Sequence, residues 1–199
     1  MKTLIMKKIL FLTFILIPLI SNTQNDKLPF SEIENYPSEY SQTNIVSRMI
    51  EGLGYRYYWA TNSLTEQDLN YRPSTDSRST FEIIEHIYSL TLMVSSSFEN
   101  TEFDFNIEKY NYTDLRQKTL FNLKYINDQL KQNPDLSQLS IRFEMGGNKM
   151  AFPFWNLVNG PISDAIWHSG QVVMNRRASG NPLQAGVNVF LGKTVSKTN

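Results

Sequence analysis

An acid and an imidazole stand four residues apart within residues 161–177, at Asp164 and His168. Side chains at this spacing lie on one face of an α-helix, close enough to share a proton or a metal ion. Gln171 and Asn175 extend the same stripe, whereas the rest of the segment is mostly apolar and contains no Lys or Glu. Because a helix that is apolar on most sides is normally buried, the pattern indicates an enclosed polar group. The alternative is a partly solvated stripe in which Asp164 pairs with His168 or caps a turn.

A further candidate ligand is His86, the only other histidine of the chain. It lies at the margin of a broad apolar arc within residues 81–94, one helical turn after Glu82. A histidine in this position is more often a residue at the edge of a core than a ligand. Both histidines nevertheless lie on apolar helical segments, and a shared site is therefore a hypothesis worth testing.

Four amphipathic helices are predicted to position these side chains. The first covers about residues 44–62, and the third covers about residues 113–132. The second begins at a capping-box pattern, in which Ser79 is followed three residues later by Glu82. In the first helix, Gly52 and Gly54 either weaken the helix or allow close contact with a neighbouring helix.

The fourth helical region begins at Trp155, is interrupted or kinked at Gly160–Pro161, and ends near residues 179–182. Before it, residues 141–154 are predicted to form a small hairpin or tight loop that turns at Gly146 and Gly147. The predicted fold class is therefore all-α: a four-helix bundle over residues 44–183, with a small hairpin or loop before the last helix.

The two ends of the chain are predicted to lie outside this domain. Residues 1–23 resemble a secretory signal peptide, with three lysines ahead of an apolar run at residues 9–20 that is too short to span a bilayer. Residues 24–43 read as an extended arm and residues 184–199 as a C-terminal tail with one strand-like piece. We expect export to the periplasm or the medium and no stable membrane association after cleavage, the alternative being an uncleaved anchor.

The net charge and the cysteine content argue against several classes of protein. The 199 residues carry no formal net charge, which gives no indication of a nucleic-acid partner. There is no cysteine, and hence neither a lipoprotein attachment site nor a disulfide framework. The high aromatic content is compatible with a homodimer, although no residue argues for one in particular.

Three segments of the chain resemble the DinB-like (damage-inducible) superfamily of four-helix bundles, which includes bacillithiol- and mycothiol-dependent transferases. The matching pieces are LTEQDLNYRPS, IIEHIYSL and HSGQVVMNRRASGNP, the most specific being HSGQ from His168 to Gln171. The resemblance implies a divalent metal held inside the bundle by His86, Asp164 and His168. The commoner family pattern has histidine at both positions of the last helix, and here Asp164 replaces the first.

A set of two histidines and one carboxylate suits Zn²⁺ best, with Fe²⁺, Mn²⁺ or Ni²⁺ as alternatives. Glu82 and Gln171 are candidates to orient the imidazoles; their alternative roles are a helix cap and a buried amide. We expect an exported metal-dependent enzyme, a hydrolase rather than a thiol transferase because the envelope is poor in low-molecular-weight thiols. The substrate is an unidentified small molecule, and no catalytic residue beyond the metal ligands is assigned.

The alternative function is a non-catalytic envelope protein of the same fold that binds a metal or a small ligand. Five aromatic residues would be candidates to hold such a ligand, but they are more commonly core residues: Tyr57, Tyr58, Trp59, Trp155 and Trp167.

Overall fold

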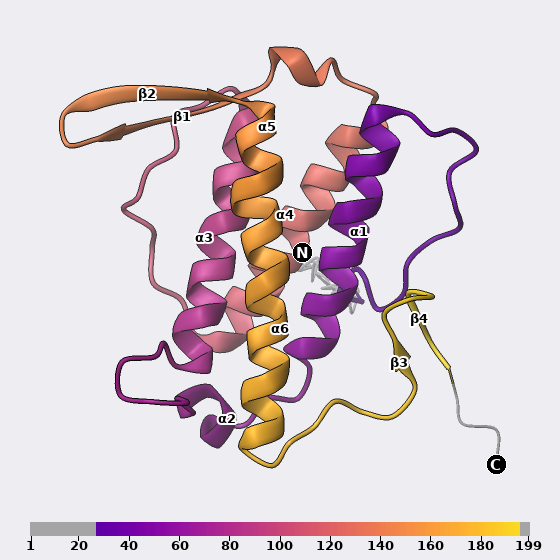
Figure 1. Cartoon of the computed structure of the whole chain (residues 1–199), viewed down its shortest axis with the longest axis vertical. Coiled ribbons are helices and arrows are strands. Elements are labelled where there is room, and N and C mark those ends of the chain that lie inside the picture. The colour runs from indigo at the N-terminus through magenta and orange to yellow at the C-terminus, as the bar shows by residue number, and fades with distance from the viewer. Residues whose placement is uncertain (1–26, 196–199) are drawn as a thin grey trace, which may run out of the picture.

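The structure is a computed structural model that describes residues 27–195. Four long helices dominate it: α1 (Gln42–Ala60), α3 (Thr80–Glu99), α4 (Tyr112–Lys131) and α6 (Ser163–Ala178). They pack in a ring, in which α1 and α3 each contact both α4 and α6. In Figure 1, α1 and α6 run downwards while α3 and α4 run upwards, so α3 and α6 are antiparallel neighbours. The predicted signal peptide lies outside the described residues.

Short elements connect the long helices. The small helix α2 (Glu66–Asn70) lies between α1 and α3, and a 3₁₀ turn (Leu136–Gln138) follows α4. Helix α5 (Phe154–Leu157) continues through a π-helical turn (Val158–Ile162) into α6. Within that turn Gly160 leaves the helical region, with ψ at −109°, and Pro161 follows it, which confirms the predicted interruption.

The predicted all-α class is wrong, because the described residues also form two antiparallel hairpins and the fold is mixed. Strands β1 (Ser140–Met145) and β2 (Asn148–Pro153) pair in register from Ser140 with Pro153 to Met145 with Asn148. The turn is made by Gly146 and Gly147 at φ values of 58° and 78°, which glycine adopts readily. The stacked rings of Phe143 and Phe152, 5.8 Å apart, support the pairing across the strands.

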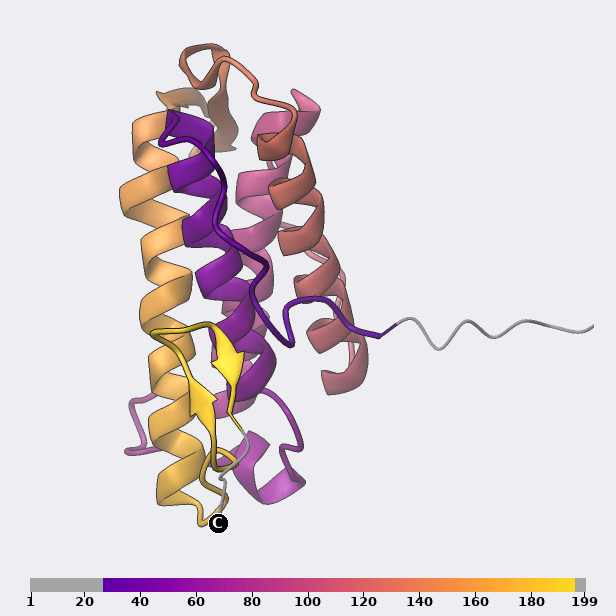
Figure 2. The same cartoon turned by 90° about the vertical axis from the view of Figure 1, so that its right-hand side faces the viewer.

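The second hairpin occupies the segment predicted to be a tail. Strands β3 (Val187–Asn188) and β4 (Lys193–Thr194) pair antiparallel and lie against α1 (Figure 2). Tyr55 of α1 contacts both strands, since its hydroxyl accepts from the backbone amide of Asn188 at 3.3 Å and lies 3.5 Å from the Thr194 hydroxyl.

The predicted arm runs along the outside of α1. Its Ile33 amide donates to the carbonyl of Gly192 in the second hairpin at 2.8 Å, and the Trp59 indole donates to the Ser31 carbonyl at 3.1 Å. The Phe30 ring lies on Gly54, where a β-carbon would come within 2.4 Å of the ring. Gly54 thus permits close contact with the arm, and not with a neighbouring helix as its spacing suggested.

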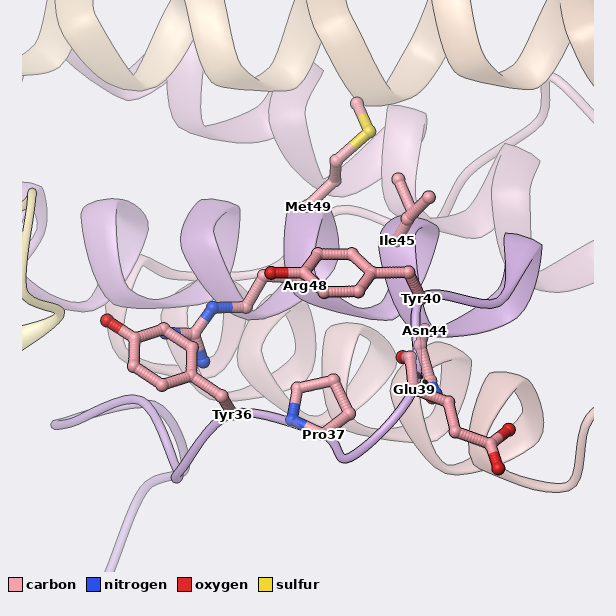
Figure 3. A pocket seen from close by; sticks show the side chains of 8 residues that line it. All are labelled: Tyr36, Pro37, Glu39, Tyr40, Asn44, Ile45, Arg48 and Met49. Atoms are coloured by element: carbon pink, nitrogen blue, oxygen red, sulfur yellow. Dashed lines mark hydrogen bonds between the residues drawn. The ribbon is translucent and has the colours of Figure 1, made fainter.

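A cavity of about 440 Å³ opens between the arm and the first turns of α1 (Figure 3). The arm contributes Tyr36 and Tyr40, and α1 contributes Ile45 and Met49. Arg48 of α1 lies 4.9 Å from the centre of the Tyr36 ring.

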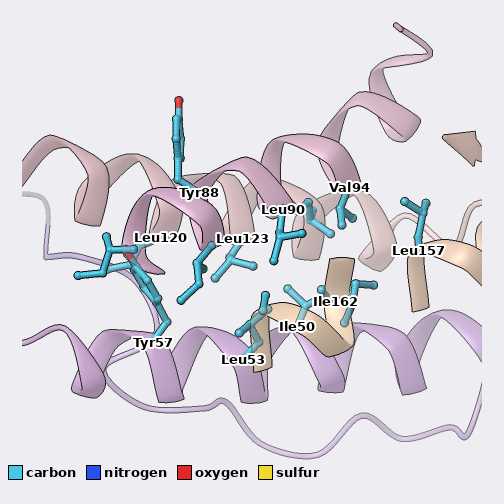
Figure 4. Packing of buried hydrophobic residues seen from close by; sticks show 14 of the residues in the cluster. Ile50, Leu53, Tyr57, Tyr88, Leu90, Val94, Leu120, Leu123, Leu157 and Ile162 are labelled. Carbon is cyan, nitrogen blue, oxygen red and sulfur yellow. The ribbon is translucent and has the colours of Figure 1, made fainter. Parts of the chain in front are cut away.

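The apolar side chains of the ring meet in one core along its axis (Figure 4). Ile50 and Leu53 of α1 face Leu120 and Leu123 of α4, and all four are essentially inaccessible to solvent.

The predicted capping box is present at the start of α3. The Glu82 backbone amide donates to the Ser79 hydroxyl, and the Glu82 carboxylate accepts from the Ser79 backbone amide.

A buried polar cluster joins the ends of α1, α2 and α6. The guanidinium of Arg176, which is 3% exposed, donates to the carbonyls of Trp59, Ala60 and Asn181 at 2.7–3.1 Å. The Asp68 carboxylate accepts hydrogen bonds from the Thr65 backbone amide, the Asn181 side-chain amide and the Ser179 hydroxyl. Burial raises the pKa of Asp68, but these hydrogen bonds outweigh it and lower the pKa to about 2.

We predict that Gly54→Ala lowers stability, because the methyl group would displace the Phe30 ring from α1. Overpacking of this kind costs about 1–3 kcal/mol, more than the gain of up to about 1 kcal/mol in helix propensity. Gly52→Ala is the matched control, since a β-carbon there meets only the flexible end of Arg56, at 3.2 Å. Urea denaturation should show a loss for Gly54→Ala and no loss for Gly52→Ala; equal behaviour would disprove the contact.

We predict that Asp68→Asn destabilises the fold by about 1–2 kcal/mol at pH 7. The pKa of Asp68 is lowered in the folded state, so its stabilising effect is complete above its unfolded pKa near 4 and is lost as the pH falls towards 2. The difference in unfolding free energy between wild type and variant should therefore shrink between pH 5 and pH 3. Glu66→Gln, at an exposed acid of the same helix, serves as control, and a pH-independent difference would contradict the assignment.

Candidate metal centre

The structure brings the three predicted ligands together at the contact of α3 with α6. His86 projects from α3, and Asp164 and His168 project from successive turns of α6. Asp164 bridges the two rings: its Oδ2 lies 3.2 Å from His86 Nε2, and its Oδ1 lies 3.4 Å from His168 Nε2. One ligand atom from each residue lies within 4.8 Å of the others, so the group could hold a metal ion.

These separations suit a divalent ion. Zinc bonds of about 2.0–2.2 Å in tetrahedral geometry place ligand atoms about 3.3–3.6 Å apart, close to the two distances from Asp164. The imidazole rings are 4.7 Å apart and nearly perpendicular, so their nitrogens can point at a common centre without the rings colliding.

The group lies on the flank of the helix ring and not sealed within it. The His168 side chain is 12% exposed, whereas those of His86 and Asp164 are 28% and 35% exposed. The enclosed site that the apolar pattern suggested is therefore partly open, and an ion held there would remain accessible to a small molecule.

Gln171 fixes the orientation of the His168 ring. Its side-chain oxygen Oε1 lies 2.6 Å from His168 Nδ1 and can only accept, so Nδ1 carries a hydrogen. In a neutral imidazole, Nε2 then holds a lone pair, and this lone pair faces the Asp164 carboxylate. Two acceptors so placed repel each other unless a proton or a metal cation lies between them.

Glu82 takes the other role that its spacing allowed. Its carboxylate accepts from the Ser79 amide at 2.7 Å and from Arg72 at 2.8 Å, and so serves as a helix cap. The hydrogen bond from Arg72, followed by that from the Ser79 backbone, lowers the pKa of Glu82 to about 2. It therefore does not orient His86.

His86 is held in the form that binds metals. Burial lowers the pKa of its imidazole, and the positive charge of Arg78 lowers it further, while the hydrogen bond with Asp164 opposes both. The neutral ring is the ligating form.

Asn175, the fourth residue of the polar stripe, has a structural role. Its side chain is buried, and its amide donates to the Thr80 hydroxyl of α3 at 3.2 Å. This bond ties α6 to α3 below the ligand group.

The five aromatic residues do not form a ligand site. Tyr57 belongs to the core, but Trp155 and Trp167 are 78% and 71% exposed and therefore do not pack in the core. The expectation that all five are core residues is wrong for these two, because they lie on the outer surface of α5 and α6.

A cleft of about 450 Å³ lies directly beside His168. It is formed by the loop before α3, the first turns of α3 and the exposed side of α6. Its lining residues are Pro73, Ser77, Arg78, Ile83, His168, Gln171, Met174 and Asn175. Sequence patterns gave no reason to single out Arg78, because it belongs to a polar loop and reaches this place only through the packing of α3 on α6.

The comparisons with known proteins add no relative. No family model, curated protein or solved structure matches this chain. The resemblance to the DinB-like superfamily therefore stays a prediction. Among the helices within residues 27–195, none is both long enough and apolar enough to cross a membrane.

We predict that Gln171→Leu weakens Zn²⁺ binding by about 10–100-fold, because the His168 ring loses the partner that fixes its tautomer and orientation. Competition with a chromophoric chelator would measure the affinity. Glu82→Gln is the control: it alters a helix cap and should leave the Zn²⁺ affinity unchanged. Equal affinities for Gln171→Leu and wild type would show that Gln171 does not orient the ring.

Proposed function

We propose that this chain is an exported metal-dependent hydrolase whose divalent ion is held by His86, Asp164 and His168. The observation that carries the proposal is the convergence of these three side chains, whose ligand atoms all lie within 4.8 Å of one another. A cation among them would bond to the Asp164 carboxylate and to both imidazoles. Export rests on the N-terminal sequence alone.

Zinc is the ion that this donor set favours first. Two imidazoles and one carboxylate are the ligands of well-known hydrolytic zinc sites, and three protein ligands leave at least one coordination position open. The same set also accepts Fe²⁺, Mn²⁺ or Ni²⁺, which metal analysis would distinguish.

The residues of the chain divide the work in a simple way. His86 from α3 and the pair on α6 hold the ion, so the site exists only where these helices pack together. Gln171 keeps Nε2 of His168 free for the ion. Asp164 lies in the first turn of α6, where the helix dipole favours a negative charge.

A divalent ion in such a site activates water near neutral pH and polarises a carbonyl or phosphoryl oxygen. The partly open flank and the adjoining cleft give a small substrate access to this place. Hydrolysis fits an exported protein better than transfer of a thiol, because low-molecular-weight thiols are cytoplasmic.

One observation favours the alternative of a non-catalytic binding protein. The residues that line the cleft include no carboxylate, and their only histidine is the ligand His168. No separate general acid or base is therefore at hand there, and Asp164 or His168 would have to move the proton while also holding the ion.

Metal binding can be tested first and hydrolysis second. We predict that wild-type protein purified without a histidine tag binds one Zn²⁺, whereas His168→Ala and Asp164→Asn bind it at least about 100-fold more weakly. Ser163→Ala, at an exposed position of the same helix, should bind like wild type. A wild type without stoichiometric metal would refute the proposal.

Metal-loaded wild type should then hydrolyse some member of a panel of small esters, amides and phosphate esters, and a chelator should abolish the activity. Stoichiometric metal binding with no hydrolysis across the panel would favour the alternative function.

A further inference from the structure

The cleft beside His168 has a lining suited to an anion. Among its eight lining residues there is one arginine and no acid, so the fixed charge at its wall is positive. The described contacts give the Arg78 guanidinium no ion pair and no hydrogen bond, and its side chain is exposed. The neighbouring Arg72, in contrast, is bound by Glu82 and by the Ser77 carbonyl.

Gln171 adds an uncharged donor to the same wall. Its oxygen accepts from His168, so its amide NH₂ group is the part left for other contacts, and Gln171 lines the cleft. With a divalent ion on two neutral imidazoles and one carboxylate, the adjoining metal site would carry one net positive charge. The Gln171 NH₂ group and the adjoining metal site therefore both favour a negative group in the cleft.

The backbone around Arg78 is held in place. Ser79, the next residue, caps α3, and the Thr80 amide donates to the Tyr71 carbonyl at 3.1 Å. On the other side, the Ser77 carbonyl accepts from Arg72 at 2.6 Å. An arginine whose backbone is held in this way loses less conformational freedom when it binds a ligand than an arginine on a free loop.

Three of the other lining residues are apolar. Pro73 and Ile83 lie on the α3 side of the cleft, and Met174 lies on the α6 side. A ligand that matches both kinds of wall has a small apolar body and an anionic group at one end.

We propose that this cleft binds a small organic anion, a carboxylate or phosphate with an apolar body, and that Arg78 recognises its charged group. This deepens the proposed function by naming the class of substrate, and it rests on that function for the reaction but not for the binding. A charge-assisted contact of this kind accounts for a preference of about tenfold or more over a neutral analogue.

The test compares benzoate, phenyl phosphate and the neutral benzamide by calorimetric titration of zinc-loaded and metal-free protein. We expect at least one of the anions to bind about tenfold or more tightly than benzamide, and the better of the two identifies the charged group. In Arg78→Ala the preference should disappear, and in Arg78→Lys part of it should return. Arg177→Ala removes an exposed arginine of α6 that does not line the cleft, and should keep the wild-type preference.

The zinc stoichiometry of Arg78→Ala should equal that of wild type, which separates this proposal from the metal centre. Loss of metal binding in wild type would overturn the proposed function, while the preference in metal-free protein would still decide the role of Arg78. Equal binding of all three probes, or an unchanged preference in Arg78→Ala, would overturn the inference.

Discussion

The site depends on the antiparallel packing of α3 against α6. This contact places a carboxylate of one helix between two imidazoles, one from each helix, and it is reinforced by the buried bond from Asn175 to Thr80. Neither helix contains the site alone. A shift of either by one residue would rotate a ligand by about 100° and take it out of the group.

Sequence spacing was sufficient to find the candidate ligands on α6 and the capping of α3. The separation of four positions from Asp164 to His168 fixes a common face, and Ser79 with Glu82 fixes a helix start, because both depend on local geometry alone. The pairing of His86 with them is a long-range contact that spacing cannot give. It rested on the scarcity of histidine in the chain and on a family resemblance.

Where sequence patterns misled, the cause was tertiary context. Trp155 and Trp167 are large and aromatic, which favours burial, yet they lie on the outer surface. The C-terminal segment was predicted to be a tail with one strand-like piece, but α1 and the arm hold it as a hairpin of two strands. Arg78 lines a cleft only because α3 packs on α6, which its position in a polar loop does not indicate. Each of these placements is decided by neighbours distant in sequence.

The contact between the arm and the second hairpin has a consequence for biosynthesis. Ile33 bonds to Gly192, and the adjacent pair of Glu32 and Lys193 is separated by 161 positions. These contacts join the first and last described parts of the chain, so they cannot form until residue 193 has left the ribosome. Such long-range closure is slow relative to helix formation, and the arm therefore stays undocked from the second hairpin until after the four long helices have been synthesised.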